Sequence, residues 1–573
     1  MYDEWGVADG YFDVDGRWHA TPEATRSALR DALADPSTAP PSWCVDLGST
    51  PALQSRCRIV LETGDDLSDH DALPADLPAG VHDLHPLDGG PTTTLVVAPA
   101  TTPQGPRGWG VAAQIYALRG SGRGIGDLDD VARLGREAAA RGAAALLLSP
   151  LHAPAPTLPQ QTSPYYPSSR RWLNPLLAPI ASEPDAATAF TRTPMIDRDH
   201  EWQTTRRRLR ARFEDDHSST QWREWARLQG DDLWDYAIWC ALAERHGANW
   251  RRWPVGLRHP RRPEVRAVVD DDPSFAVECE FHAWLQWLTD DAVQHTAATA
   301  GVGLIADLAV GCSPDGADAW INQDLMVSSA SIGAPPDTFS PDGQNWGLPP
   351  FDPWRLRSDR FAAFRGLVRA ACRGMAGLRI DHVMGLFRQF WIPSGASAAH
   401  GTYVRMPWQE LLAVLRIEAT AAGCFVVGED LGTVEVEVHE AMRRHGMWGT
   451  RVWWFDPHPD RWPADSLATV TTHDLPTVAG VRTAADGTDE MRATLDGLGQ
   501  GADPAVEVHR RVAAGGSSLF LVTTDDLAGA IERPNLPGTL VATNWCRRLD
   551  RSVSDLFEAE PGRSIVAAIR ESR

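Results

Sequence analysis

The 573-residue chain contains no lysine, so all 54 of its basic residues are arginine, against 76 acidic residues and a net charge of −22. We interpret the missing lysine as codon bias in a GC-rich genome rather than as a chemical requirement. The acidic balance argues against nucleic acid or an anionic membrane as the main partner, because both attract basic surfaces. It does not identify a partner, since acidic surfaces are common in soluble enzymes.

Features of secreted, membrane-bound and metal-stabilised proteins are also missing. The first residues, MYDEWGVADGYFDVDG, lack the basic-then-apolar pattern of a signal peptide. No apolar run reaches the roughly 18 residues that a membrane-spanning helix needs. No CxxC pair occurs among the eight cysteines. We therefore expect free thiols in a reducing cytoplasm, without a zinc site or a disulfide framework.

Several catalytic motifs are absent as well. The sequence has no GxxxxGK[ST] phosphate loop, no HExxH zinc motif and no GxSxG nucleophile elbow. The stretch SGRGIG at 121–126 lacks the rest of a dinucleotide-binding unit, so we interpret it as a loop. Nothing in the sequence indicates a cofactor or a catalytic metal. Tryptophan, in contrast, is abundant, with 24 residues against 7 tyrosines, and some of these rings could stack on a flat ligand such as a sugar.

The first hundred residues differ in pattern from the rest of the chain. Residues 1–35 predict a short strand-turn followed by a helix, and 43–98 alternate β-like runs with turns. A proline- and glycine-rich linker, TTPQGPRG, follows. We therefore predict an N-terminal helix with a small β-rich domain over 1–100 and a second domain over 101–573.

The second domain contains short apolar runs that are mostly followed by helical patterns. Apolar strands separated by helices indicate a parallel sheet that is buried on both faces, and eight of them predict a (β/α)8 barrel. The gap between the second and third runs is too long for a loop and has helical periodicity, so we predict a helical insertion over about 153–300. The eight runs are GVAAQIYAL, AAALLLSPLH, GVGLIADLAVG, GLRIDHV, CFVVGEDLG, TRVWWFD, SLATVTTHD and SLFLVTTDD.

Four of these runs end in an acid, which a core strand would avoid. In a (β/α)8 barrel the carboxyl ends of the strands carry the chemistry, so one mouth would collect four carboxylates. Each acid alone could equally cap a helix or bind its own loop, and we assign that structural role to Asp430 and Asp526. Two carboxylates in opposed roles without a cofactor fit glycoside chemistry. The four acids are Asp307, Asp381, Glu429 and Asp474, with Arg379 and His473 beside them.

An ordered set of longer motifs resembles a known family. The chain is similar to the 4-α-glucanotransferases, also called amylomaltases or disproportionating enzymes, which form glycoside hydrolase family 77. The similarity covers nearly everything from residue 109 to about 550. It is carried by GIGDLDD, SPYYPSSRRWLNPL, DLAVGCSPDGADAW, GAPPDTFSPDGQNWGLPPFDP, GLRIDHVMGLFRQFWIP, VVGEDLGTV, ATVTTHDLPTVAG and ERPNLPGT, in the family's order.

The resemblance implies a retaining transfer of α-1,4-glucan segments between maltodextrins or to glucose, with no cofactor and no metal. Asp381 would be the nucleophile, Glu429 the general acid and base, and Asp474 the transition-state stabiliser. We expect Arg379 to hold Asp381 ionised and expect the pKa of Glu429 to be raised. The loop 333–350 would overhang the site and exclude water. The resemblance places the following side chains at the substrate: Arg379, His473, Asp307, Tyr165, Ser163, Trp346, Phe339 and His382.

Two segments depart from the family's pattern. VRTAAD after Gly480 replaces an aromatic pair, and LVATNWCRRL after Thr539 replaces a Pro-Asn-Trp stretch. Three alternatives therefore stay open beside the transferase: a hydrolase of the α-amylase type, a transferase with an unusual acceptor, and a non-catalytic glucan-binding protein. Expected partners are maltodextrins and other glycogen- or starch-derived α-1,4-glucans, with no nucleic acid and no membrane.

Overall fold

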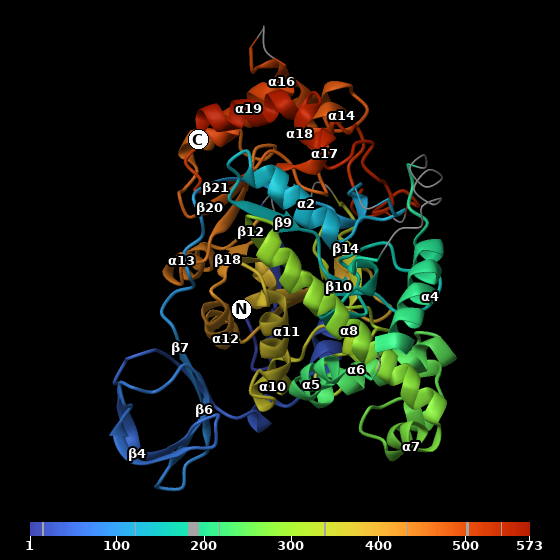
Figure 1. Ribbon diagram of the computed structural model, residues 1–573. Coiled ribbons are helices and arrows are strands. Elements are labelled where there is room, and N and C mark those ends of the chain that lie inside the picture. The colour runs from blue at the N-terminus through green and yellow to red at the C-terminus, as the bar shows by residue number, and fades with distance from the viewer. Residues whose placement is uncertain are drawn as a thin grey trace.

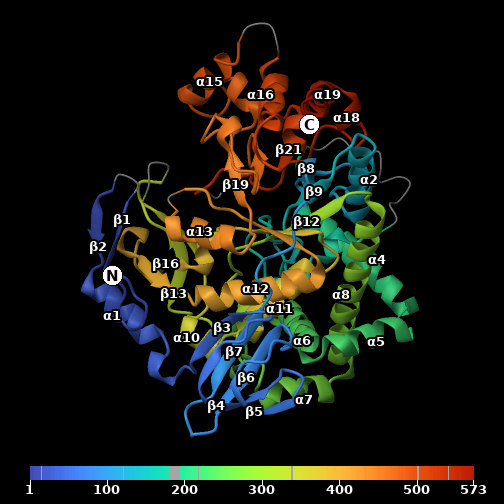
Figure 2. The ribbon, with the colours of Figure 1, turned by 90° about the vertical axis from the view of Figure 1, so that its left-hand side faces the viewer.

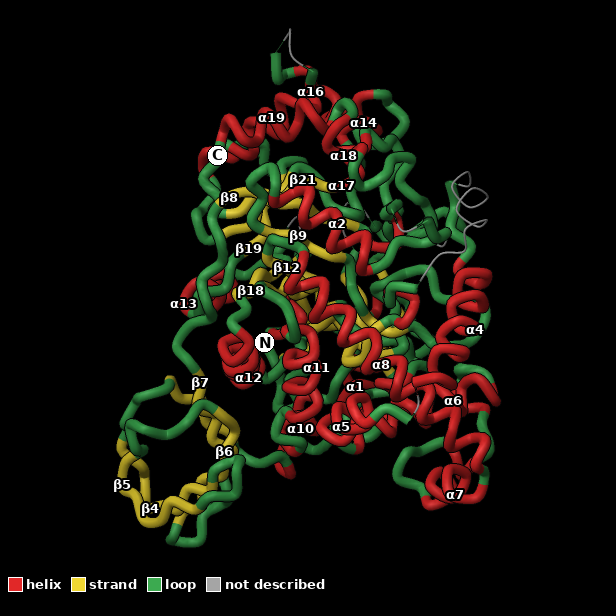
Figure 3. Tube along the Cα trace, in the orientation of Figure 1, coloured by secondary structure: helices red, strands yellow, loops and turns green. Residues whose placement is uncertain are grey.

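The computed structural model describes all residues except 14–15, 121, 181–193, 217, 337–339, 433, 500–502 and 540. Its centre is a barrel of parallel strands surrounded by helices, as Figures 1 and 3 show. No helix among the described residues is both long enough and apolar enough to span a membrane.

The barrel has eight strands whose order around the ring follows their order in the chain. The last strand pairs with the first, and the ring closes where Gly428 donates a backbone hydrogen bond to Trp448 (2.8 Å). This architecture confirms the predicted (β/α)8 barrel, and each strand falls on one of the eight predicted apolar runs. The strands are β8 (Gly108–Ala113), β9 (Ala145–Leu148), β12 (Gly303–Leu308), β15 (Gly377–Ile380), β18 (Phe425–Gly428), β19 (Gly449–Val452), β20 (Ser466–Thr469) and β21 (Leu519–Thr523).

The interior of the barrel changes from apolar to polar along the strands. Ile305, Leu467 and Leu521 belong to one buried apolar cluster inside the ring. Two residues further along the same strands stand Asp307, Thr469 and Thr523, on the same side because side chains alternate along a strand. The apolar part therefore supports a polar mouth at the carboxyl ends of the strands.

Helices cover the outside of the barrel and carry its connections. Buried apolar side chains of strands and helices form the main hydrophobic core. The outer helices are α2 (Leu128–Ala139), α9 (Ala317–Ile321), α10 (Pro353–Ser358), α11 (Ala362–Cys372), α12 (Trp408–Ala422), α13 (Val436–Arg444), α14 (Val478–Arg482), α15 (Asp489–Asp496), α16 (Pro504–Ala513), α17 (Thr524–Ala528), α18 (Asp555–Glu558) and α19 (Gly562–Ser572).

A helical insertion stands between the second and third barrel strands, as the sequence predicts. Its 27-residue helix α8 packs on α2 of the barrel and on α6 of the insertion, so it joins the two parts. Figure 1 shows the insertion in green beside the barrel. Its elements are β10 (His152–Ala153), β11 (Ser169–Leu173), α4 (Arg198–Asp216), α5 (Thr220–Gln229), α6 (Asp231–His246), α7 (Pro263–Asp271) and α8 (Pro273–Thr299).

A small β-rich unit lies beside α12 and encloses its own apolar cluster. Figure 2 shows it at the lower edge of the molecule. It is a five-stranded sheet of order β3-β7-β6-β4-β5. The strands are β3 (Ser42–Asp46), β4 (Ala52–Val60), β5 (Asp66–Ala72), β6 (Gly80–Pro86) and β7 (Thr93–Ala98).

The N-terminal segment packs on a different sheet. Its strand-turn-helix, β1 (Gly10–Phe12), β2 (Trp18–Ala20) and α1 (Glu23–Ala32), agrees with the predicted pattern. Ala8 donates to the carbonyl of Tyr403 (2.9 Å), and Thr21 bonds Thr402 (2.6 Å), in a four-stranded sheet of order β14-β13-β16-β17. The domain limits at residues 100 and 101, and those of the insertion at about 153 and 300, stay predictions. The sheet contains β13 (Ala330–Ala334), β14 (Gln344–Leu348), β16 (Arg388–Pro393) and β17 (Thr402–Arg405).

Candidate active site

The carboxyl ends of β12, β15 and β18 bring polar residues to the same level of the barrel. Asp307 in β12 pairs in register with Arg379 in β15. Ile380 in β15 pairs with Gly428 in β18, so Asp381 and Glu429 follow as the next residues on neighbouring strands. Glu429 donates its backbone N–H to the carbonyl of Ile380 (2.9 Å), which continues the register past the strand ends.

Arg379 is buried between two of the carboxylates. Its Nη1 donates to Asp307 Oδ1 (2.6 Å), and its Nη2 lies 3.1 Å from Asp381 Oδ1. Burial alone would lower the pKa of Arg379, but these carboxylates raise it well above its usual range. The permanent positive charge of Arg379 therefore interacts with both Asp307 and Asp381.

The pKa of Asp381 is raised to about 6. Burial is the main cause, and the negative charges of Asp307 and Glu429 add to it, whereas the charge of Arg379 lowers the pKa. We expect Arg379 to hold Asp381 ionised; Arg379 does lower this pKa, but burial outweighs its effect. Because Arg379 bonds Asp307 at a shorter distance, its charge is shared and does not offset the burial of Asp381. The carboxylate is still ionised at neutral pH, where the pKa of about 6 lies below the solution pH.

Glu429 is buried, and burial raises its pKa in spite of the nearby Arg379. This direction agrees with the sequence-based expectation. The backbone N–H groups of His382 and Leu431 each donate to one of its oxygens at 2.9 Å. They fix the carboxyl group in place, and each oxygen keeps a second lone pair that can carry a proton.

Asp474 follows β20 after a short loop and has a different environment. Burial would raise its pKa, but His473 (3.3 Å) and the amide of Asn535 (2.6 Å) outweigh this and lower it. Arg533 also donates to the backbone carbonyl of Asp474 (2.8 Å). Asp381 and Asp474, two of the three aspartates at the mouth, thus have pKa values shifted in opposite directions.

Tyr165 reaches the mouth from the insertion loop that precedes β11. Its hydroxyl donates to Asp307 (2.7 Å), and its ring lies 4.7 Å from that of His473 and 5.2 Å from that of Trp545. Ser163 accepts a hydrogen bond from the backbone N–H of Tyr165 (3.2 Å), so it shapes this loop. A cavity in the mouth is lined by Tyr165, Asp307, Arg379 and His473.

His382 and Trp346 form the side of the mouth next to Asp381. His382 has a positive φ of 49°, which is unusual for a residue with a side chain, and burial lowers its pKa. The ring of Trp346 stands edge-on to that of His382, with centroids 5.4 Å apart. Trp346 comes from β14, so the predicted loop 333–350 is largely the hairpin β13–β14. Phe339 lies outside the described residues.

The sequence reasoning missed four residues that support the site. Asn535 and Arg533 bond Asp474, Asp486 accepts a hydrogen bond from Arg533 Nε (2.7 Å), and Trp545 packs on Tyr165. Asn535 and Arg533 lie in the ERPNLPGT motif, which could have indicated them. Asp486 and Trp545 come from the two atypical segments, whose sequence carried no such signal.

The structural role that we assigned to Asp430 and Asp526 agrees with their contacts. Asp430 accepts hydrogen bonds from the backbone of Thr450 (2.6 Å) and from Arg451 (3.0 Å). Asp526 accepts one from the backbone of Val478 (3.0 Å). Both carboxylates therefore hold neighbouring strands and loops together.

Comparisons with known proteins agree with this arrangement. Residues 113–553 match the family model of glycoside hydrolase 77, 4-alpha-glucanotransferase. A 4-alpha-glucanotransferase from Mycobacterium tuberculosis is 40% identical over 458 residues, which cover 71% of this chain and 63% of the relative. The chain therefore spans about 63% of the length of that relative.

Two further proteins are similar over more of their length. A 4-alpha-glucanotransferase from Haemophilus influenzae is 30% identical over 575 residues, covering 84% of this chain and 81% of the relative. The crystal structure of an amylomaltase from Corynebacterium glutamicum matches with a TM-score of 0.83 and 28% identity, over 99% of this chain and 98% of that one. The chain belongs to the 4-alpha-glucanotransferase family, glycoside hydrolase family 77.

Proposed function

We propose that the chain is a 4-α-glucanotransferase that moves α-1,4-glucan segments between maltodextrins, or to glucose, with retention at the anomeric carbon. The observation that carries this proposal is the placement of Asp381 and Glu429 directly after the paired residues Ile380 and Gly428. Neighbouring strands lie about 4.8 Å apart. That spacing suits the roughly 5–5.5 Å between carboxyl groups in retaining enzymes better than the roughly 6.5–9.5 Å of inverting ones.

In the first step, Asp381 attacks the anomeric carbon of the donor glucan. The bond from that carbon to the glycosidic oxygen breaks, and Glu429 gives its proton to the leaving oxygen. The donor segment is then held as an ester on Asp381, and the shortened glucan leaves with the proton. The raised pKa of Glu429 supports its role as the acid.

In the second step, Glu429 is ionised and acts as the base. It takes the proton from the 4-hydroxyl of an acceptor sugar, whose oxygen attacks the anomeric carbon and releases Asp381. Asp474, with its lowered pKa, stays an anion in both steps and can accept hydrogen bonds from the hydroxyls of the distorted sugar. Trp346 and Tyr165 would contact the sugars on either side, and Arg379, Asp307, His473 and His382 would hold the ring at the nucleophile.

The substrates and the cellular location that we propose follow from the assignment of the chain as a 4-α-glucanotransferase. Donors would be maltodextrins and other glycogen- or starch-derived α-1,4-glucans, and glucose would serve as an acceptor. A cytoplasmic location agrees with eight cysteines that are all free and seven of which are buried.

Incubation with maltotriose tests this function. A transferase produces free glucose together with a ladder of longer maltodextrins, without a net gain of reducing ends. Glucose and maltose without longer products would instead identify a hydrolase of the α-amylase type. A folded protein that binds maltotriose without turnover would be a glucan-binding protein, and transfer only to a different acceptor sugar would identify a specialised transferase.

A further inference from the structure

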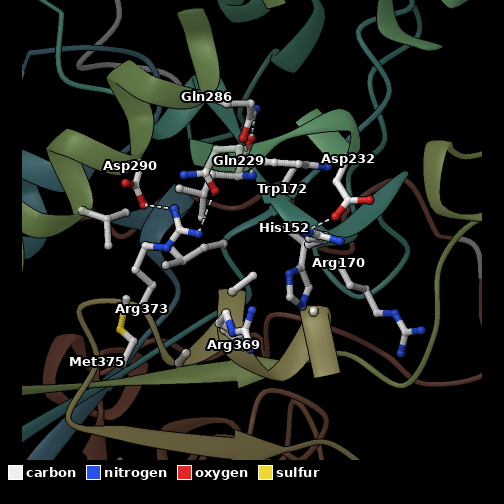
Figure 4. A pocket seen from close by; sticks show the side chains of 18 of the residues that line it. His152, Arg170, Trp172, Gln229, Asp232, Gln286, Asp290, Arg369, Arg373 and Met375 are labelled. Atoms are coloured by element: carbon white, nitrogen blue, oxygen red, sulfur yellow. Dashed lines mark hydrogen bonds and ion pairs between the residues drawn. The ribbon is translucent and has the colours of Figure 1, made fainter. Parts of the chain in front are cut away.

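A second polar cavity lies outside the barrel mouth, between the insertion and the barrel (Figure 4). Its volume is about 390 Å³, which falls within the range of small-molecule sites. Its walls come from β11, from the insertion helices α5, α6 and α8, and from α11 of the barrel. It shares only Asp307 with the cavity in the mouth.

The walls of this cavity carry more positive than negative charge. Four arginines and three aspartates line it, but Asp307 bonds Arg379 and Tyr165 in the mouth, and Arg369 is paired with Glu418 (2.8 Å) outside the cavity. Three arginines therefore face Asp232 and Asp290 across the cavity. Burial lowers the pKa of His152, which also lines the cavity, to about 3. Its ring is therefore neutral and adds no charge to the walls. A local excess of positive charge is notable on a chain with a net charge of −22. The arginines are Arg170, Arg171, Arg369 and Arg373.

Arginines of the cavity wall are fixed by ion pairs and hydrogen bonds but retain further N–H donors. Arg373 donates to Asp290 (3.1 Å) and to Gln229 (3.2 Å), and Arg171 lies 2.6 Å from Asp232. Figure 4 shows the contacts of Arg373 with Asp290 as dashed lines. A guanidinium has five N–H donors, so several remain on each residue. Its planar fork matches the oxygens of phosphate or carboxylate.

Arg170 connects this cavity with the catalytic side of the barrel. The residue is 9% exposed, and its Nε has no hydrogen-bond partner among the described residues. A buried donor without a partner is unfavourable, and a bound oxygen would satisfy it. Its Nη1 donates to the carbonyl of Val310 (2.8 Å), and it also lines a neighbouring cavity that contains Asp381 and His382.

The ring of Trp172 in the cavity wall is not free to stack on a sugar. Trp172 is only 5% exposed, and its ring stacks on Tyr236 with centroids 5.5 Å apart. The guanidinium of Arg171 lies 5.6 Å from the same ring. Trp225 donates its indole N–H to Asp290 (3.0 Å). The chemistry of the walls therefore favours an anion over a neutral sugar.

We propose that this cavity is a binding site for a small phosphate-bearing anion, with Arg171 and Arg373 as its main ligands. The two sources of this chemistry that fit the volume are inorganic phosphate and a hexose phosphate. The proposal rests on the cavity alone and does not depend on the proposed transferase activity, because its readout is binding and not turnover.

Isothermal titration calorimetry on the full chain tests the proposal, with inorganic phosphate and glucose 1-phosphate as probes. We expect at least one of the two to bind, with an affinity at least about tenfold weaker in Arg373→Gln and in Arg171→Gln. Arg171→Gln is included because both partners of its ion pair are partly exposed (29% and 51%), so this variant should fold. Arg245→Gln is the matched control, since Arg245 forms a similar ion pair with Asp272 elsewhere on the insertion.

The outcomes separate the two sources and can contradict the site. Equal binding of both probes assigns the site to the phosphate group, whereas tighter binding of glucose 1-phosphate shows that the sugar also makes contacts. The proposal is overturned if neither probe binds up to about 10 mM, or if Arg171→Gln and Arg373→Gln bind like Arg245→Gln. Displacement of phosphate by maltose from the unmodified protein would also overturn it, because the phosphate would then lie in the proposed glucan site of the mouth and not in this cavity.

Discussion

Asp381 and Glu429 are both buried and both have raised pKa values, so in the proposed mechanism their protonation sets the pH range of activity. As the proposed nucleophile, Asp381 would attack only as an anion, and its pKa is raised to about 6. As the pH falls through about 6, kcat/KM should decline, because the nucleophile takes up a proton. As the pH rises through the raised pKa of Glu429, kcat/KM should decline again, because the acid has lost its proton.

The measurement is the pH dependence of kcat/KM with maltotriose, from about pH 4 to about pH 9. The two groups interact, so the limbs of the curve belong to the pair of carboxyls. An acid limb centred near the ordinary aspartate value of about 4 would show that Arg379 controls Asp381 after all.

Glu429→Gln isolates the proton transfer, because glutamine has a similar shape but no acidic proton. We expect the rate with maltotriose to fall about 1,000-fold or more, within the range that general acid catalysis contributes together with the lost base. Binding of maltodextrin, measured by calorimetry, should stay within a few-fold of the unmodified protein. Maltosyl fluoride has a leaving group that needs no proton, so formation of the ester on Asp381 should largely recover with it. Unchanged activity with maltotriose would contradict the role of Glu429.

Asp486 positions Asp474 through Arg533, although it lies in the atypical segment after Gly480. Its carboxylate accepts from Arg533 Nε (2.7 Å), and Arg533 donates to the carbonyl of Asp474 (2.8 Å). Asp486→Asn should therefore lower kcat about tenfold and change KM little, because the proposed role of Asp474 is mainly in the transition state.

A matched control for this variant is Arg482→Gln, which removes an exposed ion pair with Asp503 from the neighbouring α14. Such a pair contributes little to stability, so this variant should keep its activity. If Asp486→Asn has the same kcat as Arg482→Gln, the contact between Arg533 and Asp474 does not position the carboxylate.

The barrel strands could be predicted from the sequence, whereas the contacts around Asp474 could not. A strand that is buried on both faces is a continuous apolar run, and an acid at its end stands out against it, as Asp381 and Glu429 do. Asn535 and Arg533 do not follow an apolar run, because they lie in a loop without periodicity, so no pattern marks them in the sequence. Their bonds to Asp474 span about sixty positions of the chain and arise only when the loops fold over the mouth.

The hairpin β13–β14 shows a second limit of sequence patterns. Glycine and proline are frequent in 333–350, and they predict a loop rather than strands. The structure has strands because Gly333 permits a close approach: a Cβ there would lie 2.0 Å from the carbonyl of Gln344. Backbone contacts of this kind depend on a glycine next to a neighbouring chain segment and leave no periodic signal.

The same hairpin places Trp346 edge-on to His382, which follows the proposed nucleophile Asp381 in the chain. If the Trp346 ring limits the access of water to the site, Trp346→Ala should raise the share of hydrolysis among all turnovers about two- to tenfold. The physical reason is that the lost ring opens the side of the ester on Asp381 to solvent.

The measurement compares the net gain of reducing ends with the glucose released from maltotriose, because hydrolysis creates new reducing ends and transfer does not. Trp18→Ala removes an exposed tryptophan from β2 and serves as the control. An unchanged share of hydrolysis in Trp346→Ala would mean that other parts of the mouth exclude water.

The five-stranded sheet is joined to the barrel by several polar contacts, among them the ion pair of Arg365 with Glu62 (2.6 Å) and the contacts of Arg416. Arg416 in α12 is 3% exposed, and its Nη1 donates to Asp46 (3.0 Å) and to the carbonyls of Pro99 (2.7 Å) and Ala100 (3.1 Å). These carbonyls lie in the segment that leads from β7 into the first barrel strand. One side chain of the barrel thus fixes the exit of the small β-rich unit.

Arg416→Met retains the apolar stem of this side chain but removes its donors. We expect the free energy of unfolding to fall by about 2–4 kcal/mol, because a buried donor to several carbonyl groups is lost. The connection around residues 99–107 should be cleaved faster by a protease in limiting amount, since its local opening becomes easier. The kcat with maltotriose should stay the same, because Arg416 lies far along α12 from the mouth and contacts no residue proposed to bind sugar. Arg56→Met, which removes an exposed ion pair with Asp69 within the same sheet, should change stability by less than about 0.5 kcal/mol. If both variants are equally stable and equally resistant to the protease, the β-rich unit is held by its apolar contacts with α12 and by its other ion pairs, such as Arg365 with Glu62, and not by Arg416.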